Sequence, residues 1–170
     1  HERLVGSEMC IRDSLETVQL SHNQLTGTIP GHIFRLPHLE SFSIESNCID
    51  GPIPRSICDS TTLKVLDLNG LHTASSCQTR FLSALSKAYI SSASAMDDAY
   101  ECLFSMPNIT TLHLSGLGIQ GSLPSDLQIS HTLEDLSLSY NFIPGQIPDQ
   151  LQQRPFKSLD LSNNLSLIHI

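Results

Sequence analysis

The chain has 170 residues, with 17 acidic and 9 basic side chains, so its formal net charge is −8 and its pI is near 5.3. An acidic surface repels the phosphate backbone of nucleic acids, and we therefore expect no nucleic-acid partner. No apolar run reaches the roughly 20 residues that a membrane-spanning helix needs. The five cysteines contain no CxxC pair of the kind found in zinc sites, so we expect neither a metal nor a cofactor.

The chain repeats itself with a period of 24 residues. One copy reads LETVQLSHNQLTGTIPGHIFRLPH from Leu15, and the next reads LESFSIESNCIDGPIPRSICDSTT from Leu39; clear copies return at Ile109 and Leu133. A fixed period between about 20 and 50 residues is typical of solenoids, whose neighbouring coils bury one another's apolar faces. Such a fold offers a long curved surface to partners and no closed catalytic cleft.

Each copy divides into a strand and a returning segment. In the first copy, Val18 and Leu20 flank the polar Gln19, which predicts a short strand with one buried face. Asn23 follows at the strand exit, where its amide can bond backbone groups and form a ladder through the stack. Gly27 then permits an unusual backbone angle at the turn into the returning segment.

The middle of the chain is irregular. The copy that starts at Leu63 loses the pattern, and the next clear start, Ile109, lies 46 residues further on. One interpretation is a single repeat with a long insert, and the other is two repeats of 22 and 24 residues. We favour the second, with a degenerate repeat from Leu85, because Leu103 and Met106 then match the returning segment of the regular copies.

The resulting division covers residues 1–164. It comprises a partial repeat 1–14, repeats 15–38, 39–62 and 63–84, a degenerate repeat 85–108, repeats 109–132 and 133–155, and a partial repeat 156–164. Residues 165–170 (LSLIHI) depart from the pattern and resemble the translation of a transposase sequencing adapter, although chance agreement is an alternative. We therefore leave these residues out of the fold prediction, as is done for any added segment, and we expect the chain to be a fragment.

The consensus LxxLxLxxNxLxGxIP resembles the plant-type leucine-rich repeat over nearly the whole chain. The resemblance implies an α/β solenoid, a right-handed horseshoe or superhelix with a parallel concave sheet and turns or short 3₁₀ segments on the convex side. It also implies a non-catalytic recognition module that binds a protein or peptide ligand on the concave sheet. The alternatives are a secreted inhibitor, a cell-wall structural protein, and an intracellular scaffold with reduced thiols.

Location and further partners follow from the same resemblance. It implies a receptor-like kinase or receptor-like protein at the extracellular face of the plasma membrane, or a secreted protein, with the cytoplasm as the alternative. A kinase domain would belong to a part of the protein beyond this chain, and a co-receptor is a further implied partner.

The strand alternation defines the predicted concave face. In register, its middle column contains Gln19, Ser43, Asp67, His113, Ser137 and Asp160. The candidate ligand-binding residues on or beside this face are His22, Glu45, Asp67, Asn69, His113 and Tyr140. The face is polar and mildly acidic, which suits a basic peptide or the hydroxyl groups of a glycan, and Tyr140 is the aromatic residue expected to act as an anchor.

Two covalent modifications are predicted. Asn108-Ile-Thr110 is a glycosylation sequon, with Asn108 as the acceptor. Cys77 and Cys102 fall on the outer side of consecutive predicted turns, which favours a disulfide between them; five free thiols are the alternative.

An enzymatic function is not expected. The chain lacks the GxSxG, phosphate-loop and HExxH motifs. Asp67, His113 and Ser137 are the residue types of a hydrolytic set, but a degenerate repeat would place Asp67 and His113 two strands apart, too far for a direct hydrogen bond.

Overall fold

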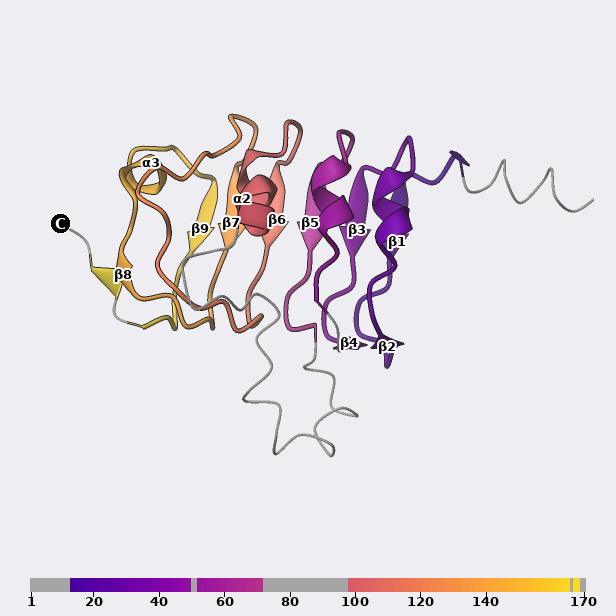
Figure 1. Cartoon of the computed structure of the whole chain (residues 1–170), viewed down its shortest axis with the longest axis horizontal. Helices are drawn as coiled ribbons and strands as arrows, with labels where there is room; N and C mark the ends of the chain where they lie inside the picture. Colours follow the sequence, from indigo (N-terminus) through magenta and orange to yellow (C-terminus); the bar gives the residue numbers. More distant parts are fainter. Residues whose placement is uncertain (1–12, 50–51, 72–97, 166, 169–170) are drawn as a thin grey trace, which may run out of the picture.

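The computed structural model of the chain describes residues 13–49, 52–71, 98–165 and 167–168. These residues form a solenoid whose main sheet has six short parallel strands in chain order. The strands are β1 (Thr17–Gln19), β3 (Ser41–Ser43), β5 (Val65–Asp67), β6 (Thr111–His113), β7 (Asp135–Ser137) and β9 (Ser158–Asp160). Figure 1 shows them as a row that follows the sequence from one end of the molecule to the other.

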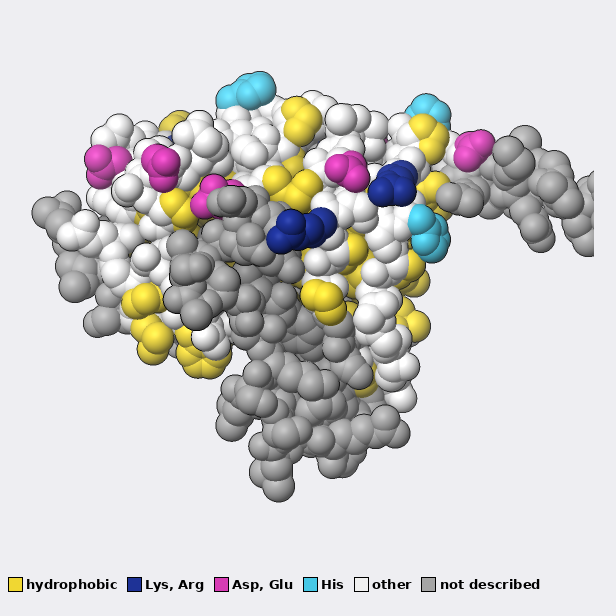
Figure 2. Space-filling view, in the orientation of Figure 1, with side chains coloured by type: hydrophobic (Ala, Val, Ile, Leu, Met, Phe, Trp, Pro, Cys, Tyr) yellow, Lys and Arg dark blue, Asp and Glu magenta, His cyan; other side chains and the backbone are white. Residues whose placement is uncertain are grey.

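The returning segments form a second row. They contain the 3₁₀ helices η1 (Gly31–Arg35) and η2 (Arg55–Asp59) and the α-helices α2 (Asp98–Ser105) and α3 (Asp149–Gln152). Figure 2 shows one face of the solenoid, where charged side chains of both signs and histidines are scattered among apolar ones. The predicted α/β solenoid, with parallel strands on one side and 3₁₀ segments or turns on the other, is confirmed.

Two small parallel ladders join the coils at a second edge. Strand β2 (Thr26–Gly27) pairs with β4 (Cys48–Ile49), and β8 (Gly145–Gln146) pairs with β10 (Leu167–Ile168). The second pairing includes two residues of the C-terminal segment 165–170, and the origin of that segment stays a prediction. The ladder uses only backbone N–H and C=O groups, so it forms without the side-chain signature of a repeat.

The core is a column of aliphatic and aromatic side chains between the two rows. The central residue of each inner strand is almost fully buried, as at Phe42, Leu66, Leu112 and Leu136. Phe34 from η1 packs edge-on against Phe42, with ring centroids 5.1 Å apart. Each such side chain contributes roughly 1.5–3 kcal/mol through its burial, and no coil could obtain this alone.

Asparagine side chains at three strand exits bond their coil to the one before it. The Oδ1 atom of Asn141 accepts from the N–H groups of Leu117 and Ile119, both at 3.1 Å. Its Nδ2 atom donates to the carbonyls of Leu114 at 3.0 Å and Leu138 at 2.9 Å. The side chains of Asn47 and Asn164 make equivalent bonds, which confirms the predicted asparagine ladder.

The interpretation of the middle region is wrong. Strand β5 pairs directly with β6, with Asp67 opposite His113, so no strand lies between them. The described residues 63–71 and 98–108 therefore supply the strand and the returning segment of one long coil, and the segment 85–97 of the predicted degenerate repeat lies outside the described residues. That segment has Ala93 where the ladder needs Asn and Asp97 where the turn needs Gly, so it lacks both groups that close a coil.

The end of that coil matches the prediction. Helix α2 occupies the position of a returning segment, and its residue Leu103 is fully buried. Met106, which follows the helix, is 3% exposed. The correspondence between this stretch and the returning segments of the regular copies is therefore confirmed, although the strand assigned to the same repeat is not.

The predicted disulfide is also wrong. Cys102 in α2 bonds to Cys58 in η2, with their Cα atoms 5.7 Å apart, whereas Cys77 lies outside the described residues. This error has the same origin as the degenerate repeat. The extra repeat placed the segment that contains Cys77 between η2 and α2, so Cys58 and Cys102 were not expected to be neighbours. Cys48 is disulfide-bonded as well, so the alternative of five free thiols is excluded. Within the described residues, no helix is both long enough and apolar enough to cross a membrane.

Replacement of Asn141 by Ala should destabilise the solenoid by roughly 2–4 kcal/mol, because it leaves several buried backbone groups unbonded. Asn23→Ala is the matched control: Asn23 is exposed and bonds only the carbonyls of Leu20 and Ser21 in its own turn, so its loss should cost less than 1 kcal/mol. Urea unfolding followed by circular dichroism measures both. Equal losses would contradict the role assigned to the ladder.

Tryptic mapping without reductant should recover Cys58 and Cys102 in one linked peptide pair. The double variant Cys58→Ser/Cys102→Ser should lose roughly 2–4 kcal/mol of stability, because the bond joins residues 44 apart and restricts the unfolded chain. Recovery of Cys102 linked to Cys77 would contradict this assignment.

Candidate functional site

Strand register brings the predicted middle column together on one surface. The pairings place Gln19 beside Ser43, Ser43 beside Asp67, and Asp67 beside His113. His113 in turn lies beside Ser137, and Ser137 beside Asp160. The column is confirmed residue by residue, because a parallel ladder without a bulge keeps equivalent positions of successive coils side by side.

His113 on β6 lies between two carboxylates from the adjacent strands. Its Nδ1 atom is 3.6 Å from Oδ2 of Asp67 on β5, and its Nε2 atom is 3.2 Å from Oδ1 of Asp135 on β7. The side chains are 24% exposed at His113, 20% at Asp67 and 35% at Asp135. Asp67 and His113 are thus neighbours on adjacent strands, contrary to the separation expected with a degenerate repeat.

The two carboxylates keep the imidazole charged. The hydrogen bond to Asp67, followed by the hydrogen bond and the charge of Asp135, raises the pKa of His113 to about 9, although burial alone would lower it. At neutral pH, His113 is therefore a cation held by both ring nitrogens. Asp135 is not among the candidate residues named from the sequence. It lies two residues before Ser137, the register partner of His113, and this diagonal position on the next strand is the signal that could have identified it.

This arrangement argues against hydrolytic chemistry. A general base must be neutral and must have a free nitrogen that can take the proton of the nucleophile. His113 is protonated, and both of its nitrogens face carboxylates, so it cannot activate Ser137. Among the described residues, no group of three His, Cys, Asp or Glu side chains is placed to hold a metal ion.

Hydrogen-bonded serines and Asp160 lie beside Asp67, His113 and Asp135 on the concave face, and these residues together are called the floor of that face. The Oγ atoms of Ser115 and Ser137 are 2.6 Å apart, and Ser139 Oγ donates to Ser115 Oγ at 3.0 Å. Ser162 N–H donates to Oδ1 of Asp160 at 3.0 Å. This backbone bond, together with bonds from the side chains of Ser162, Ser139 and Ser137, holds the pKa of Asp160 below its ordinary value. The floor is therefore polar and ordered before any ligand arrives.

Ion pairs line the margins of the floor. Lys64 Nζ is 2.7 Å from Glu40 Oε1, and Lys157 bonds to Glu134. At the opposite margin, His22 Nε2 is 2.9 Å from Glu45 Oε1. Such exposed pairs contribute little to stability, and their importance is the charge that they present at the surface.

The other candidate residues occupy two kinds of position. Asn69 is half-buried, and its Oδ1 atom accepts from Ser115 N–H at 2.7 Å, so this oxygen already supports the coil. Tyr140 is 67% exposed at the end of the strand β7 segment, beside the serine floor. Together with His22, Glu45, Asp67 and His113, they are all placed on or beside the concave face, and their contact with a ligand stays a prediction.

The sequon lies away from this surface. Asn108 is exposed just after the returning segment of the long coil, and its Nδ2 atom donates to the carbonyl of Thr61 at 2.7 Å. The side chain is reachable from solvent, so its glycosylation stays a prediction.

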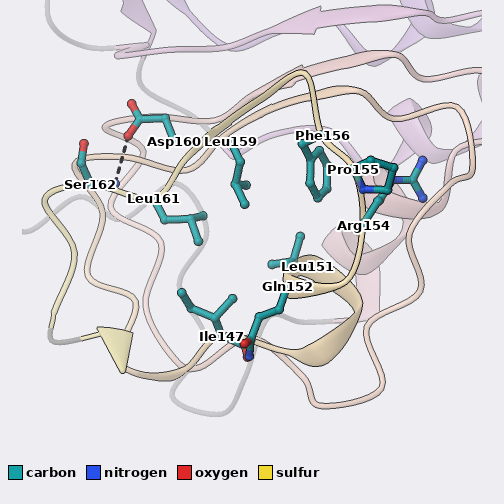
Figure 3. A pocket seen from close by; sticks show the side chains of 10 residues that line it. All are labelled: Ile147, Leu151, Gln152, Arg154, Pro155, Phe156, Leu159, Asp160, Leu161 and Ser162. Atoms are coloured by element: carbon teal, nitrogen blue, oxygen red, sulfur yellow. Dashed lines mark hydrogen bonds between the residues drawn. The ribbon is translucent and has the colours of Figure 1, made fainter. Parts of the chain in front are cut away.

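A cavity of about 800 Å³ lies at the C-terminal end of the stack, where Leu151, Phe156, Leu159 and Leu161 point into it (Figure 3). Its lining is mainly the apolar core, and Asp160 and Ser162 border it on the side of the concave face. Leu159 and Leu161 occupy the positions that Leu136 and Leu138 occupy in the coil before, where they are completely buried. The cavity is the open face of the apolar column.

Comparison with known proteins identifies the family. Residues 13–71 and 132–153 match leucine-rich-repeat patterns. The chain is 32% identical to Receptor-like protein 7 of Arabidopsis thaliana over 160 residues, which is 92% of this chain and 14% of that protein. It is also 32% identical over 139 residues to the Leucine-rich repeat receptor protein kinase MSL1 of Oryza sativa subsp. japonica, covering 81% of this chain and 8% of that protein.

Solved structures agree with this family. The leucine-rich-repeat ectodomain of the Arabidopsis thaliana receptor kinase GASSHO1/SCHENGEN3, in complex with CASPARIAN STRIP INTEGRITY FACTOR 2, superposes with a TM-score of 0.67 at 29% identity over 89% of this chain and 16% of that one. The Arabidopsis receptor kinase HAESA, in complex with the peptide hormone IDA and the co-receptor SERK1, gives 0.65 at 25% identity over 89% and 22%. The chain belongs to the plant-type leucine-rich-repeat proteins and spans 14% and 13% of the length of the Arabidopsis receptor-like proteins 7 and 18.

The stability of the solenoid should fall as the pH rises from about 6.5 to above 9. The folded-state pKa of His113 lies above its ordinary value, so the contribution of its ion pairs is complete below pH 6.5 and is lost as the ring deprotonates near pH 9. The loss should be on the order of 1–2 kcal/mol, after allowance for solvent screening. Denaturant unfolding of the wild type and of His113→Gln between pH 6 and 10 isolates the effect, because other groups titrate in both. A parallel fall in the two proteins, or a ring midpoint near 6.5 by NMR, would contradict it.

Proposed function

We propose that this chain is part of the ectodomain of a plant cell-surface receptor-like protein, and that it captures a peptide ligand on its concave sheet without catalysis. The observation that carries the proposal is the ordered polar floor formed by Asp67, His113 and Asp135 together with the bonded serines. Receptor ectodomains of similar fold, at 25% and 29% identity, are seen in complex with the peptide hormone IDA and with CASPARIAN STRIP INTEGRITY FACTOR 2, respectively.

The rigidity of the floor supports binding of an extended peptide. Its side chains are held by strand register and by bonds to one another, so a ligand does not have to order them and less binding energy is lost. The floor also offers polar partners on several successive coils, although it has no deep pocket. This arrangement suits an extended peptide that lies across the strands.

Charge favours a basic peptide over a neutral or acidic one. The described concave residues include seven carboxylates against three cations. The carboxylates belong to Glu16, Glu40, Glu45, Asp67, Glu134, Asp135 and Asp160, and the cations to Lys64, His113 and Lys157. This surplus attracts positive ligands and repels negative ones over the length of the sheet.

The disulfide supports an extracellular location. Bonds such as Cys58–Cys102 persist in oxidising compartments and are rare in the cytosol. Signalling after capture would depend on other parts of the protein, such as a kinase domain, or on a co-receptor recruited to the complex.

Panning a random peptide library against the wild-type chain tests the proposal. Selected peptides should bind the concave variant Glu45→Gln/Asp67→Asn/Tyr140→Ala at least tenfold more weakly, because the variant removes two carboxylates and the exposed ring. The control variant, Arg35→Ala/Asp59→Ala/Asp126→Asn, changes exposed residues of the returning segments and should bind as the wild type does. Peptides that bind the concave variant undiminished would refute capture on the sheet.

A further inference from the structure

Tyr140 has a backbone conformation that its side chain does not favour. The same position in each described coil has a positive φ, so the fold imposes a left-handed residue there. The six residues are His22, Ser46, Gly70, Gly116, Tyr140 and Asn163, with φ between 52° and 67°. Gly and Asn accept this conformation readily, whereas a bulky aromatic residue is an outlier.

Burial does not compensate for this strain. The side chain of Tyr140 is 67% exposed, so packing contributes little of the free energy that a buried ring would. The stability of the coil therefore does not account for a tyrosine at this position. A strained and exposed residue at the edge of a binding surface is the kind of outlier that supports a functional role.

Two consecutive hydrogen bonds through Ser162 connect the backbone of Tyr140 to the carboxylate of Asp160. The Tyr140 N–H donates to the carbonyl of Ser162 at 3.0 Å, and the Ser162 N–H donates to Oδ1 of Asp160 at 3.0 Å. Figure 3 shows the second of these bonds. The serine hydrogen bonds that lower the pKa of Asp160 also orient its carboxylate, so it stays ionised on the strand adjacent to the one that leads to Tyr140.

Asp160 also differs from most of the other acidic residues of the concave face. In the described part of the chain, Glu40, Glu45, Asp67, Glu134 and Asp135 each have a Lys or His partner, whereas Asp160 and, at the far N-terminal end of the sheet, Glu16 have none. Its negative charge is therefore available to a cation from outside.

The side of Tyr140 that faces the preceding coils is open. The equivalent positions there are Gly116 and Gly70, which carry no side chains. A Cβ atom built at Gly116 would contact only backbone atoms of Gly70, the nearest at 3.7 Å. A flat or elongated group lying on the sheet can thus approach the tyrosine ring from this direction.

We propose that Tyr140 and Asp160 form a subsite for one cationic side chain, Arg or Lys, of a peptide ligand. A cation over the ring face is attracted by the π-system, while the carboxylate supplies a charge-assisted hydrogen bond. This assignment rests on the proposed function and specifies one contact of the ligand. Arg fits better than Lys, because its planar guanidinium both stacks on the ring and bonds the carboxylate.

Titration of the 15N-labelled chain with acetyl-arginine amide tests the subsite, with acetyl-citrulline amide as the neutral probe of similar shape. The arginine probe should cause saturable shifts of the Tyr140 and Ser162 amide signals, and the citrulline probe should not. Tyr140→Gly and Asp160→Asn should each weaken the apparent affinity by about fivefold or more. Phe142→Ala is the matched aromatic control, since Phe142 is 45% exposed but lies outside the concave strand positions, and it should bind as the wild type does.

Thermal melting separates binding from folding. Tyr140→Gly should melt no lower than the wild type, because glycine relieves the left-handed strain, while Tyr140→Ala keeps the strain and should melt below Tyr140→Gly. Equal shifts with both probes, or unchanged affinity in Tyr140→Gly and Asp160→Asn, would overturn the subsite. Panned peptides that require Glu45 and Asp67 but neither Tyr140 nor Asp160 would remove the subsite and leave peptide capture standing.

Discussion

The backbone ladder between successive coils is the constraint on which the rest of the structure depends. Each strand bonds to the next through parallel pairs, such as Asp67 opposite His113, and the buried asparagines repeat this coupling at the strand exits. Because the ladder runs without a bulge, equivalent residues of all coils share one column. The core layers on one side of the sheet and the columns of polar side chains on its concave face are both consequences of that registration.

The concave surface shows how such a ladder brings charge together. Asp67, His113 and Asp135 come from coils far apart in sequence, yet adjacent strands bring them within contact distance. The histidine then serves as a fixed cation between two anions, and not as a base. Its effect is to order the centre of the face, whereas Asp160 at the C-terminal side has no such partner among the described residues.

The regular part of the fold could be predicted because its signals are local. The spacing of Val18, Leu20 and Asn23 determines where a strand lies and which side is buried, and the period then gives the column of side chains. The long coil could not be divided correctly, because Leu71 occupies the asparagine position. There, Asn69 Oδ1 accepts from Ser115 N–H, a bond that no repeat consensus indicates.

For the candidate surface, the sequence predicts which residues lie on the face but not which of them contact one another. Membership of the face follows from alternation, but the contact of His113 with Asp135 depends on side-chain conformations across strands, and the Cys58–Cys102 bond depends on which returning segments are neighbours. The unusual φ of Tyr140 had a weak signal in the sequence, since Gly70 and Gly116 occupy its equivalent positions. This signal becomes visible only when the strand exits of all coils are aligned, because the coil that starts at Leu63 departs from the repeat pattern.

The Cys58–Cys102 bond has a topological consequence for the long coil. It closes a covalent ring that contains every residue between the two cysteines, and the paired strands β5 and β6 hold the same stretch of chain from the other side of the solenoid. A single cleavage of the main chain within that ring would leave the N-terminal and C-terminal portions in one molecule.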